Sequence, residues 1–315
     1  MEISFSLRVT RHVSRIDSLT TGCIFPDPEY NCSMHKKTHP WLWLLAFLLT
    51  LLLAVYQRLS GPTYPISGQE TITGIIIQYK FSRSWTSGSE LPIHIAGAGP
   101  GLELRLHYRR FPYSSGEKWT KTAMEKIEGG FEAAIPGQSP AGKVAYKVEA
   151  AVKGKRIWLN RGQPVVARFK GEVPTALLIF HVIFMFAGLL LALRTGLEAL
   201  RRDGCWQKLV PWTLAVTSVG GLILGPLVQK YAFGAYWTGF PLGGDLTDSK
   251  TLFAVLFWLA AFFMRKKSRW WPLAATVLMI TVYLIPHSML GSELNYQTGK
   301  IETAKEVRGS TLKIK

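Results

Sequence analysis

Residues 173–193 read VPTALLIFHVIFMFAGLLLAL, an uncharged run that decides the kind of fold this chain can adopt. Crossing the hydrocarbon core of a bilayer as a helix takes about 20 apolar residues. A run of this length without a charged side chain predicts a transmembrane helix rather than a helix packed in a soluble core. The chain is therefore expected to be an integral membrane protein.

Further hydrophobic runs lie on both sides of this segment, at 41–56, 209–229, 251–264 and 270–286. The run at 251–264 is short for a membrane span unless Arg265 and Lys266 extend it by snorkelling to the interface. Together the runs predict a membrane α-helical bundle of about five transmembrane helices. Four of these helices fall in a membrane domain at 173–289.

The basic residues are placed asymmetrically, and this predicts an orientation. Lys/Arg residues are dense before the first run, between the second and third runs, and between the fourth and fifth runs. Short basic loops face the cytoplasm by the positive-inside rule. We therefore expect a multi-pass inner (plasma) membrane protein with a cytoplasmic amino terminus and an extracytoplasmic carboxyl terminus. Residues 57–172, 230–250 and the polar tail 290–315 would lie outside.

The net charge of +17 could also indicate a nucleic-acid partner. Such a surface needs aromatic and basic side chains on one exposed domain, and no segment of the sequence gathers them. The lipid bilayer is the expected partner, and nucleic acid is not.

The amino-terminal part divides at a second methionine, Met34. Residues 1–33 show no sustained periodicity and are expected to be a disordered or wrongly assigned extension. From Met34 a basic segment precedes an apolar run, and no small-x-small cleavage site follows it. Residues 34–61 are therefore expected to be an uncleaved signal anchor that forms the first transmembrane helix.

Residues 62–172 have the pattern of an all-β domain. Apolar and polar residues alternate from Leu102 to Tyr108 and again from Val144 to Ala150, which predicts strands with one buried face. Further strands are expected at 75–81, 91–95, 130–135, 156–159 and 165–169. About seven short strands separated by Gly/Pro/Ser turns predict a β-sandwich inserted between the first two helices. It has no cysteine, so a hydrophobic core must stabilise it.

The segment PGQSPAGKVAYKVEA, residues 136–150, resembles the late strand pair of immunoglobulin-like and fibronectin-type-III-like modules. In these modules a Gly-x-Val-x-Tyr-x-Val strand follows a proline-rich turn. The resemblance covers about 62–172 at most. It implies a domain that binds, spaces or orients an extracytoplasmic protein partner, and it implies no active-site residue.

The candidate site residues gather on the outer side of the predicted bundle. They are His181 inside a span, His287 after the last span, and Trp237, Asp245 and Asp248 in the aromatic, glycine-rich loop 230–250. An ionisable residue inside a span is a functional candidate by default. His181 and His287 could be axial ligands of a haem, or could bind a transition metal with Asp245 or Asp248. Alternatively, His181 forms a hydrogen bond across helices, and Asp248 or Ser249 caps the fourth helix.

The sequence contains no hydrolase elbow, nucleotide-binding loop or zinc-type cysteine spacing. Two functions of different classes remain. The first is a scaffold, assembly or partner-binding component on the extracytoplasmic face, without catalysis. The second is a small redox or metal-handling protein that uses His181 and His287.

Overall fold

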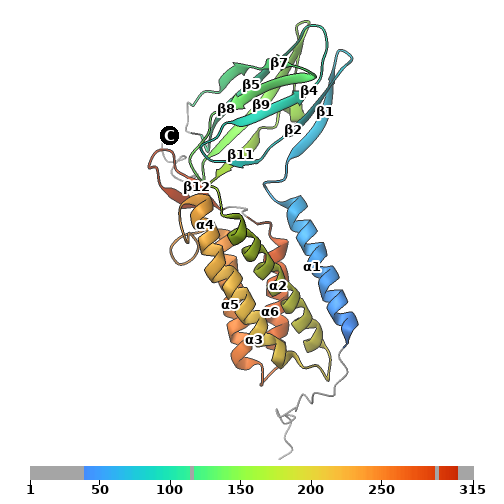
Figure 1. Ribbon diagram of the computed structural model, residues 1–315, viewed down its shortest axis with the longest axis vertical. Coiled ribbons are helices and arrows are strands. Elements are labelled where there is room, and N and C mark those ends of the chain that lie inside the picture. The colour runs from blue at the N-terminus through green and yellow to red at the C-terminus, as the bar shows by residue number, and fades with distance from the viewer. Residues whose placement is uncertain (1–38, 114–116, 288–290, 304–315) are drawn as a thin grey trace, which may run out of the picture. The chain divides into compact units, whose positions relative to one another are not determined.

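A computed structural model describes residues 39–113, 117–287 and 291–303. Along the chain, a long helix comes first, a β-domain follows it, and a set of packed helices and a short strand pair come last (Figure 1). The expected extension 1–33 and Met34 lie outside the described residues.

The β-domain contains two sheets. Its strands are β1 (Ile66–Ile72), β2 (Ile75–Phe81), β3 (Ser84–Thr86), β4 (Leu91–Ala96), β5 (Leu102–Phe111), β6 (Thr120–Ala123), β7 (Glu125–Ile127), β8 (Gly130–Ile135), β9 (Lys143–Val152), β10 (Lys155–Trp158) and β11 (Val165–Lys170), with a short 3-10 turn η1 (Leu159–Gly162) before the last. One sheet has the order β1-β2-β4-β8-β7. The other has the order β3-β11-β9-β5-β6, with β10 also paired to β9.

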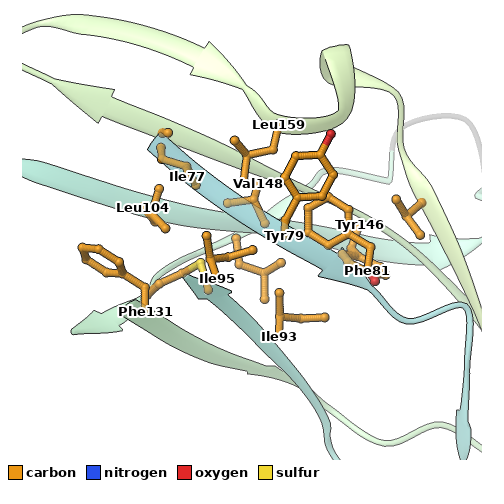
Figure 2. Packing of buried hydrophobic residues seen from close by; sticks show 14 of the residues in the cluster. Ile77, Tyr79, Phe81, Ile93, Ile95, Leu104, Phe131, Tyr146, Val148 and Leu159 are labelled. Carbon is orange, nitrogen blue, oxygen red and sulfur yellow. The ribbon is translucent and has the colours of Figure 1, made fainter. Parts of the chain in front are cut away.

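A single apolar core lies between the two sheets. In β5 the residues Leu102, Leu104 and Leu106 are buried, while Glu103 and Arg105 between them are exposed. The core also takes side chains from the other sheet, and Figure 2 shows part of it: Ile77, Tyr79, Phe81, Ile93, Ile95, Leu104, Phe131, Tyr146, Val148 and Leu159. Alternate burial of this kind is what selects a strand with one face inward.

The sequence predicted most of the longer strands, with β1 as the exception. The alternating runs fall in β5 and β9, and the segments expected at 75–81, 91–95, 130–135 and 165–169 fall in β2, β4, β8 and β11. The segment expected at 156–159 falls in β10, which ends at Trp158. β1, β3, β6 and β7 were not predicted; the residues of β6 and β7 are all exposed and carry no alternating pattern. The likeness to immunoglobulin-like modules stays a prediction.

The helices are α1 (Pro40–Ser60), α2 (Thr175–Leu200), α3 (Trp206–Ser218), the π-helical turn η2 (Val219–Leu224), α4 (Gly225–Phe233), α5 (Leu246–Met264) and α6 (Trp270–Leu284). In the described part of the chain, four helical segments are long and apolar enough to cross a membrane: α1, α2, the continuous stretch Trp206–Phe233, and α5. α6 is apolar but shorter. The fold therefore combines helices that could span a membrane with a β-sheet domain.

The fourth hydrophobic segment is longer than its sequence indicated. α5 begins at Leu246, so the missing length is added at the amino end and not by Arg265 and Lys266 at the other end. Asp245 caps this helix, accepting a hydrogen bond from the Thr247 N–H at 2.8 Å. The cap therefore lies three residues earlier than the expected Asp248 or Ser249.

The segment after α6 forms a strand pair, β12 (Ser292–Leu294) and β13 (Ile301–Thr303), which contacts the β-domain. The Leu294 N–H donates to the Ala141 carbonyl oxygen at 3.1 Å, and Lys143 forms a buried ion pair with Glu293. The Tyr296 hydroxyl donates to the carbonyl oxygen of Lys143 at 2.9 Å. The sequence analysis had treated this region only as part of a polar tail.

Candidate functional site

A cavity of about 290 Å³ lies between the helices and strand β11, and we call it the inter-domain cavity. At about 30 Å³ for each water molecule, it has room for roughly ten waters or a small organic molecule of similar volume. Part of its wall is apolar and is formed by Leu178, Val182, Met185, Phe186, Val228 and Val282. The rest carries polar and charged groups, so the cavity has an apolar side and a polar side.

Four of the five candidate residues line this cavity: His181, Asp245, Asp248 and His287. Trp237 does not line it. The Trp237 indole N–H instead donates to the carbonyl oxygen of Phe240 at 3.1 Å, within its own loop. The aromatic loop thus contributes its acidic residues to the cavity wall but not its tryptophan.

Arg168 is the most unusual group in the wall. It lies on β11, on the strand face opposite the core residues Ala167 and Phe169, and only 8% of it is exposed. Its guanidinium faces the Phe233 ring at 5.2 Å and borders the cavity, and it forms no ion pair within 4 Å with a carboxylate of the described ranges. Burial lowers the pKa of Arg168, and the nearby carboxylates of Glu293 and Asp245 oppose that effect.

Gly291, which has no side chain, leaves space in the cavity beside Arg168. A Cβ atom at Gly291 would lie 3.4 Å from Nη1 of Arg168 and 3.5 Å from Oδ2 of Asp245. A glycine here therefore keeps a space between the guanidinium and the helix cap that a side chain would narrow.

The carboxylate of Asp245 is already supplied with donors. Besides the Thr247 N–H, it accepts hydrogen bonds from the N–H and the hydroxyl of Ser292, each at 2.8 Å. The Thr238 hydroxyl lies 3.2 Å from Oδ2 of Asp245, the oxygen that also accepts from Ser292. Asp245 therefore joins the start of α5 to β12 and to the aromatic loop.

Asp248 has a similar structural role one turn later. Its Oδ2 accepts hydrogen bonds from the N–H of Thr238 at 2.7 Å and from the N–H of Gly239 at 3.0 Å. A Cβ at Gly239 would lie 2.4 Å from the Asp248 Cβ, so this approach requires glycine. Asp248 thus fastens the aromatic loop to α5.

Lys250 is a buried cation in the same helix. Its ammonium donates to the carbonyl oxygens of Val282 at 3.2 Å and Ile285 at 2.8 Å, which are unpaired acceptors at the end of α6. An ammonium has three donors, so one remains for the cavity. Asp245 and Asp248 already accept several hydrogen bonds each. The charged groups of the cavity wall that could still bond to a ligand are therefore mainly donors, those of Arg168 and Lys250.

The two histidines approach the cavity from different elements. His181 Nδ1 lies 3.0 Å from the Gly220 carbonyl oxygen, so it forms the hydrogen bond across helices that was one of its two expected roles. Gly220 belongs to the π-helical turn, a feature that often accompanies functional sites. His287 lines the cavity without a hydrogen bond from its ring to another described residue.

Metal binding by these groups has limited geometric support. Within the described ranges, no three His, Cys, Asp or Glu side chains form a group that could hold a metal ion. His181 also uses one ring nitrogen for Gly220. The second nitrogen of His181 and the ring of His287 are the groups that a haem or metal would have to use.

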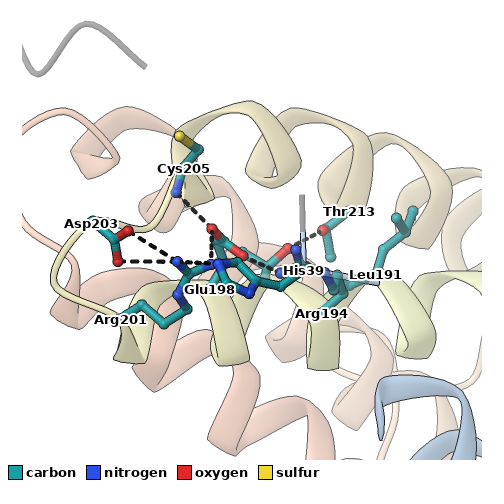
Figure 3. Close-up of polar contacts among 9 residues, drawn as sticks. His39, Leu191, Arg194, Glu198, Arg201, Asp203, Cys205 and Thr213 are labelled. Carbon is teal, nitrogen blue, oxygen red and sulfur yellow. Dashed lines mark hydrogen bonds and ion pairs between the residues drawn. The ribbon is translucent and has the colours of Figure 1, made fainter. Parts of the chain in front are cut away.

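A second charged cluster lies at the opposite end of α2, and Figure 3 shows it. Arg194 forms a buried ion pair with Glu198, and Arg201 lies 3.4 Å from the other carboxylate oxygen. Glu198 also accepts a hydrogen bond from the N–H of Cys205 at 3.1 Å. Arg201 in turn pairs with Asp203 at 3.0 Å. Both arginines belong to the basic segment that the sequence placed between the second and third hydrophobic runs, and Glu198 was not among the predicted site residues.

The sequence analysis also missed Arg168 and Lys250. Lys250 could have been found, because it follows Asp245 and Asp248 at the start of an apolar run, where a cation is costly unless it is paired. Arg168 gave no signal, because it stands at a normal outward position of a strand. Residues far along the chain, among them Phe233, Asp245, Gly291 and Glu293, lie near it in the fold.

No protein-family model matches this chain, and no curated protein matches it significantly. The function is therefore argued from the site alone.

Proposed function

We propose that this protein is an integral membrane protein that binds a small amphipathic molecule with an anionic head group in the inter-domain cavity. It would act as a binding component on the extracytoplasmic face and not as a catalyst. The apolar wall would contact the body of the ligand. Arg168 and Lys250 would bind its head group.

The buried guanidinium of Arg168 is the observation that carries this proposal. A buried polar group without a hydrogen bond costs about 1–3 kcal/mol, and more if it is charged. Such a group is retained when a ligand supplies the missing acceptors, and carboxylates and phosphates fit the guanidinium fork. Among the described residues, Asp245 and Glu293 act on Arg168 through their charge and form no ion pair with it, while its guanidinium borders the cavity.

The proposed orientation rests on the basic loops. With five spans, counting α6, the β-domain and the cavity are extracytoplasmic and the amino terminus is cytoplasmic. The cluster of Lys/Arg between α5 and α6 supports this, because Arg265, Lys266 and Lys267 have no acidic neighbour in sequence. A reporter that is active only in the cytoplasm, fused after Lys315, should be silent; activity there would contradict the orientation.

A haem or metal bound by His181 and His287 is the alternative function. Its support is that both rings line one cavity. An absorption spectrum and the metal content of the purified protein test it directly. A Soret band or stoichiometric metal that is lost in His287→Ala would favour this alternative over the amphipathic ligand.

The binding test uses the full chain in nanodiscs of zwitterionic lipid and a matched set of eight-carbon probes. These are octanoate, octyl phosphate, octanol and octyltrimethylammonium, and calorimetry measures their affinity. We expect the two anions to bind more tightly than the alcohol and the ammonium not to bind. Equal affinity for octanol and octanoate would contradict the proposed anionic head group.

Arg168 variants then test the role of the guanidinium. Arg168→Gln should weaken octanoate binding by about 10- to 100-fold, the loss expected for a charged hydrogen bond of about 1.5–3 kcal/mol. Arg168→Lys keeps the charge that Asp245 and Glu293 need and should give an intermediate loss. Lys170→Gln, an exposed position on the same strand, is the matched control and should bind normally. Unchanged affinity in Arg168→Gln would remove Arg168 from the site.

A further inference from the structure

The outward face of the six-stranded sheet carries a row of alternating rings and cations. Its members are Tyr113, Arg109, Trp119, Lys147 and Trp158, and we call it the cation–aromatic face. The Arg109 guanidinium lies 3.3 Å from the centre of the Tyr113 ring and 4.3 Å from that of Trp119. The Lys147 ammonium lies 5.0 Å from Trp119 and 3.9 Å from Trp158. Each cation therefore stands between two rings.

Strand register brings these residues together from distant parts of the chain. Arg109 is on β5 and Lys147 on β9, and their neighbours Leu106 and Val148 point into the core on the other side of the sheet. Trp119 precedes β6 and Trp158 ends β10. The sequence analysis found no segment that gathers aromatic and basic residues, because the face exists only after the strands have paired.

A buried layer beneath the face fixes its rings. His107 lies directly opposite Lys147 in the register, and its ring meets Trp158 edge-to-face at 5.0 Å between centroids. Glu149 lies 3.5 Å from His107 and 3.7 Å from Arg156. A rigid, pre-ordered surface loses little side-chain entropy when it binds a partner.

The two cations at the centre of the face, Arg109 and Lys147, form no ion pair with another residue of the described ranges. Nε of Arg109 is buried and has no hydrogen-bond partner in the described part of the chain. The face is half exposed, with 44% of Tyr113 accessible. It therefore has positive charge and donor capacity available for an acidic partner.

We propose that the cation–aromatic face docks an acidic segment of an extracytoplasmic protein, with its carboxylates on Arg109 and Lys147 and its apolar atoms against the rings. Trp, Tyr and Arg are the residue types that dominate binding energy at protein interfaces. A nucleic-acid strand would need a continuous basic track, and here Glu103 and Glu149 interrupt the positive charge. This site shares no residue with the inter-domain cavity, so either proposal can fail alone.

The test measures binding of an acidic peptide to the full chain in zwitterionic nanodiscs. The probe is a short peptide of alternating Glu and Leu with one Tyr; the comparison peptide has Lys in place of each Glu. We expect binding of the acidic peptide only, and weaker binding as the salt concentration rises. Single-stranded oligothymidine and a sulfated polysaccharide are tested in parallel. Tighter binding of either polymer than of the acidic peptide would overturn the assignment to a protein partner.

Matched double variants locate the site. Arg109→Gln/Lys147→Gln should weaken peptide binding by about tenfold or more, as the loss of two cation contacts predicts. Lys80→Gln/Lys126→Gln removes the same charge from exposed positions on the other sheet and should have less than about a twofold effect. If both double variants lost the same affinity for the peptide, the loss would follow from net charge alone, and the proposal would be overturned. If the first variant unfolds, Trp119→Leu gives the same test without changing charge.

Discussion

Buried charges lie at both ends of α2, but they are paired at one end and not at the other. At the Leu200 end, Arg194, Glu198, Arg201 and Asp203 form a connected network in which each charge has an opposite partner. At the Thr175 end, Arg168 is about as buried, forms no ion pair with another described residue, and borders a cavity. Desolvated charges are tolerated in both places.

This difference indicates a structural role for the charges at the Leu200 end and a binding role for Arg168 at the Thr175 end. A network in which each charge has an oppositely charged partner holds helices together, even though Nε of Arg194 has no hydrogen-bond partner among the described residues. A cluster that leaves donors facing a cavity costs stability until something binds there, which is the pattern expected of a binding site. Changes at the completed end should therefore affect folding, and changes at the open end should affect binding.

The largest effect is expected at the completed end. Glu198→Gln leaves Arg194 buried without its carboxylate, and breaking a buried pair in this way costs about 3–5 kcal/mol. We expect a much lower level of folded protein in membranes and a lower melting temperature of the purified protein. Asp203→Asn, an exposed partner of Arg201, is the control and should change stability by about 1 kcal/mol or less. A mild effect of Glu198→Gln would undo the contrast between the two ends.

A smaller loss is expected for Lys143→Met, which breaks the buried pair with Glu293 between the β-domain and β12. The segment around β12 can detach into solvent without unfolding the rest, so the cost should be limited to about 2 kcal/mol of local opening. Hydrogen exchange at Leu294 should accelerate, while exchange in the core of the β-domain should not. Faster exchange throughout the β-domain would mean that this contact is needed for folding and not only for docking.

A change at the open end should affect binding with little change in stability. Gly291→Ala adds a methyl group at ordinary contact distance from Arg168 and Asp245, so the fold should accept it. The added volume narrows the space beside the guanidinium, and octanoate affinity should fall by about three- to tenfold. Melting temperature and octanoate affinity should be measured on the same sample. A loss of stability with normal affinity would reverse the expected roles.

The smallest effect concerns pH. Burial lowers the pKa of His107; Glu149 opposes this, and Lys121 and Lys147 add to it. A histidine with a lowered folded-state pKa binds fewer protons than in the unfolded state, so its stabilisation is complete above about pH 6.5 and is lost as the pH falls below that value. Stability of the β-domain should fall by about 1 kcal/mol or less between about pH 7 and pH 5. His107→Gln should flatten this part of the pH profile, and an unchanged slope would exclude His107 as its source.

The sequence predicted those features that depend on local pattern. Alternation located β5 and β9, the rule for ionisable residues in spans selected His181, and the aromatic outer loop supplied Asp245 and Asp248. Features that depend on distant packing were missed. Arg168 is an ordinary outward residue in the pattern of β11, and its burial comes from distant residues such as Phe233, Asp245 and Gly291. Glu198 looked like part of a loop because the extent of α2 could not be read from hydrophobicity alone.

The strand pair after α6 sets an order of events during synthesis. The β-domain leaves the ribosome before α2, yet Gly291 and Ser292, which complete the cavity, and Glu293, which holds the β-domain, are made after α6. Binding of the proposed ligand should thus begin only when all the helices have been made, and occupancy would mark a chain whose cavity is complete. In a nascent chain arrested at residue 286, octanoate should give β11 no protection from hydrogen exchange, whereas it should protect β11 in the released protein.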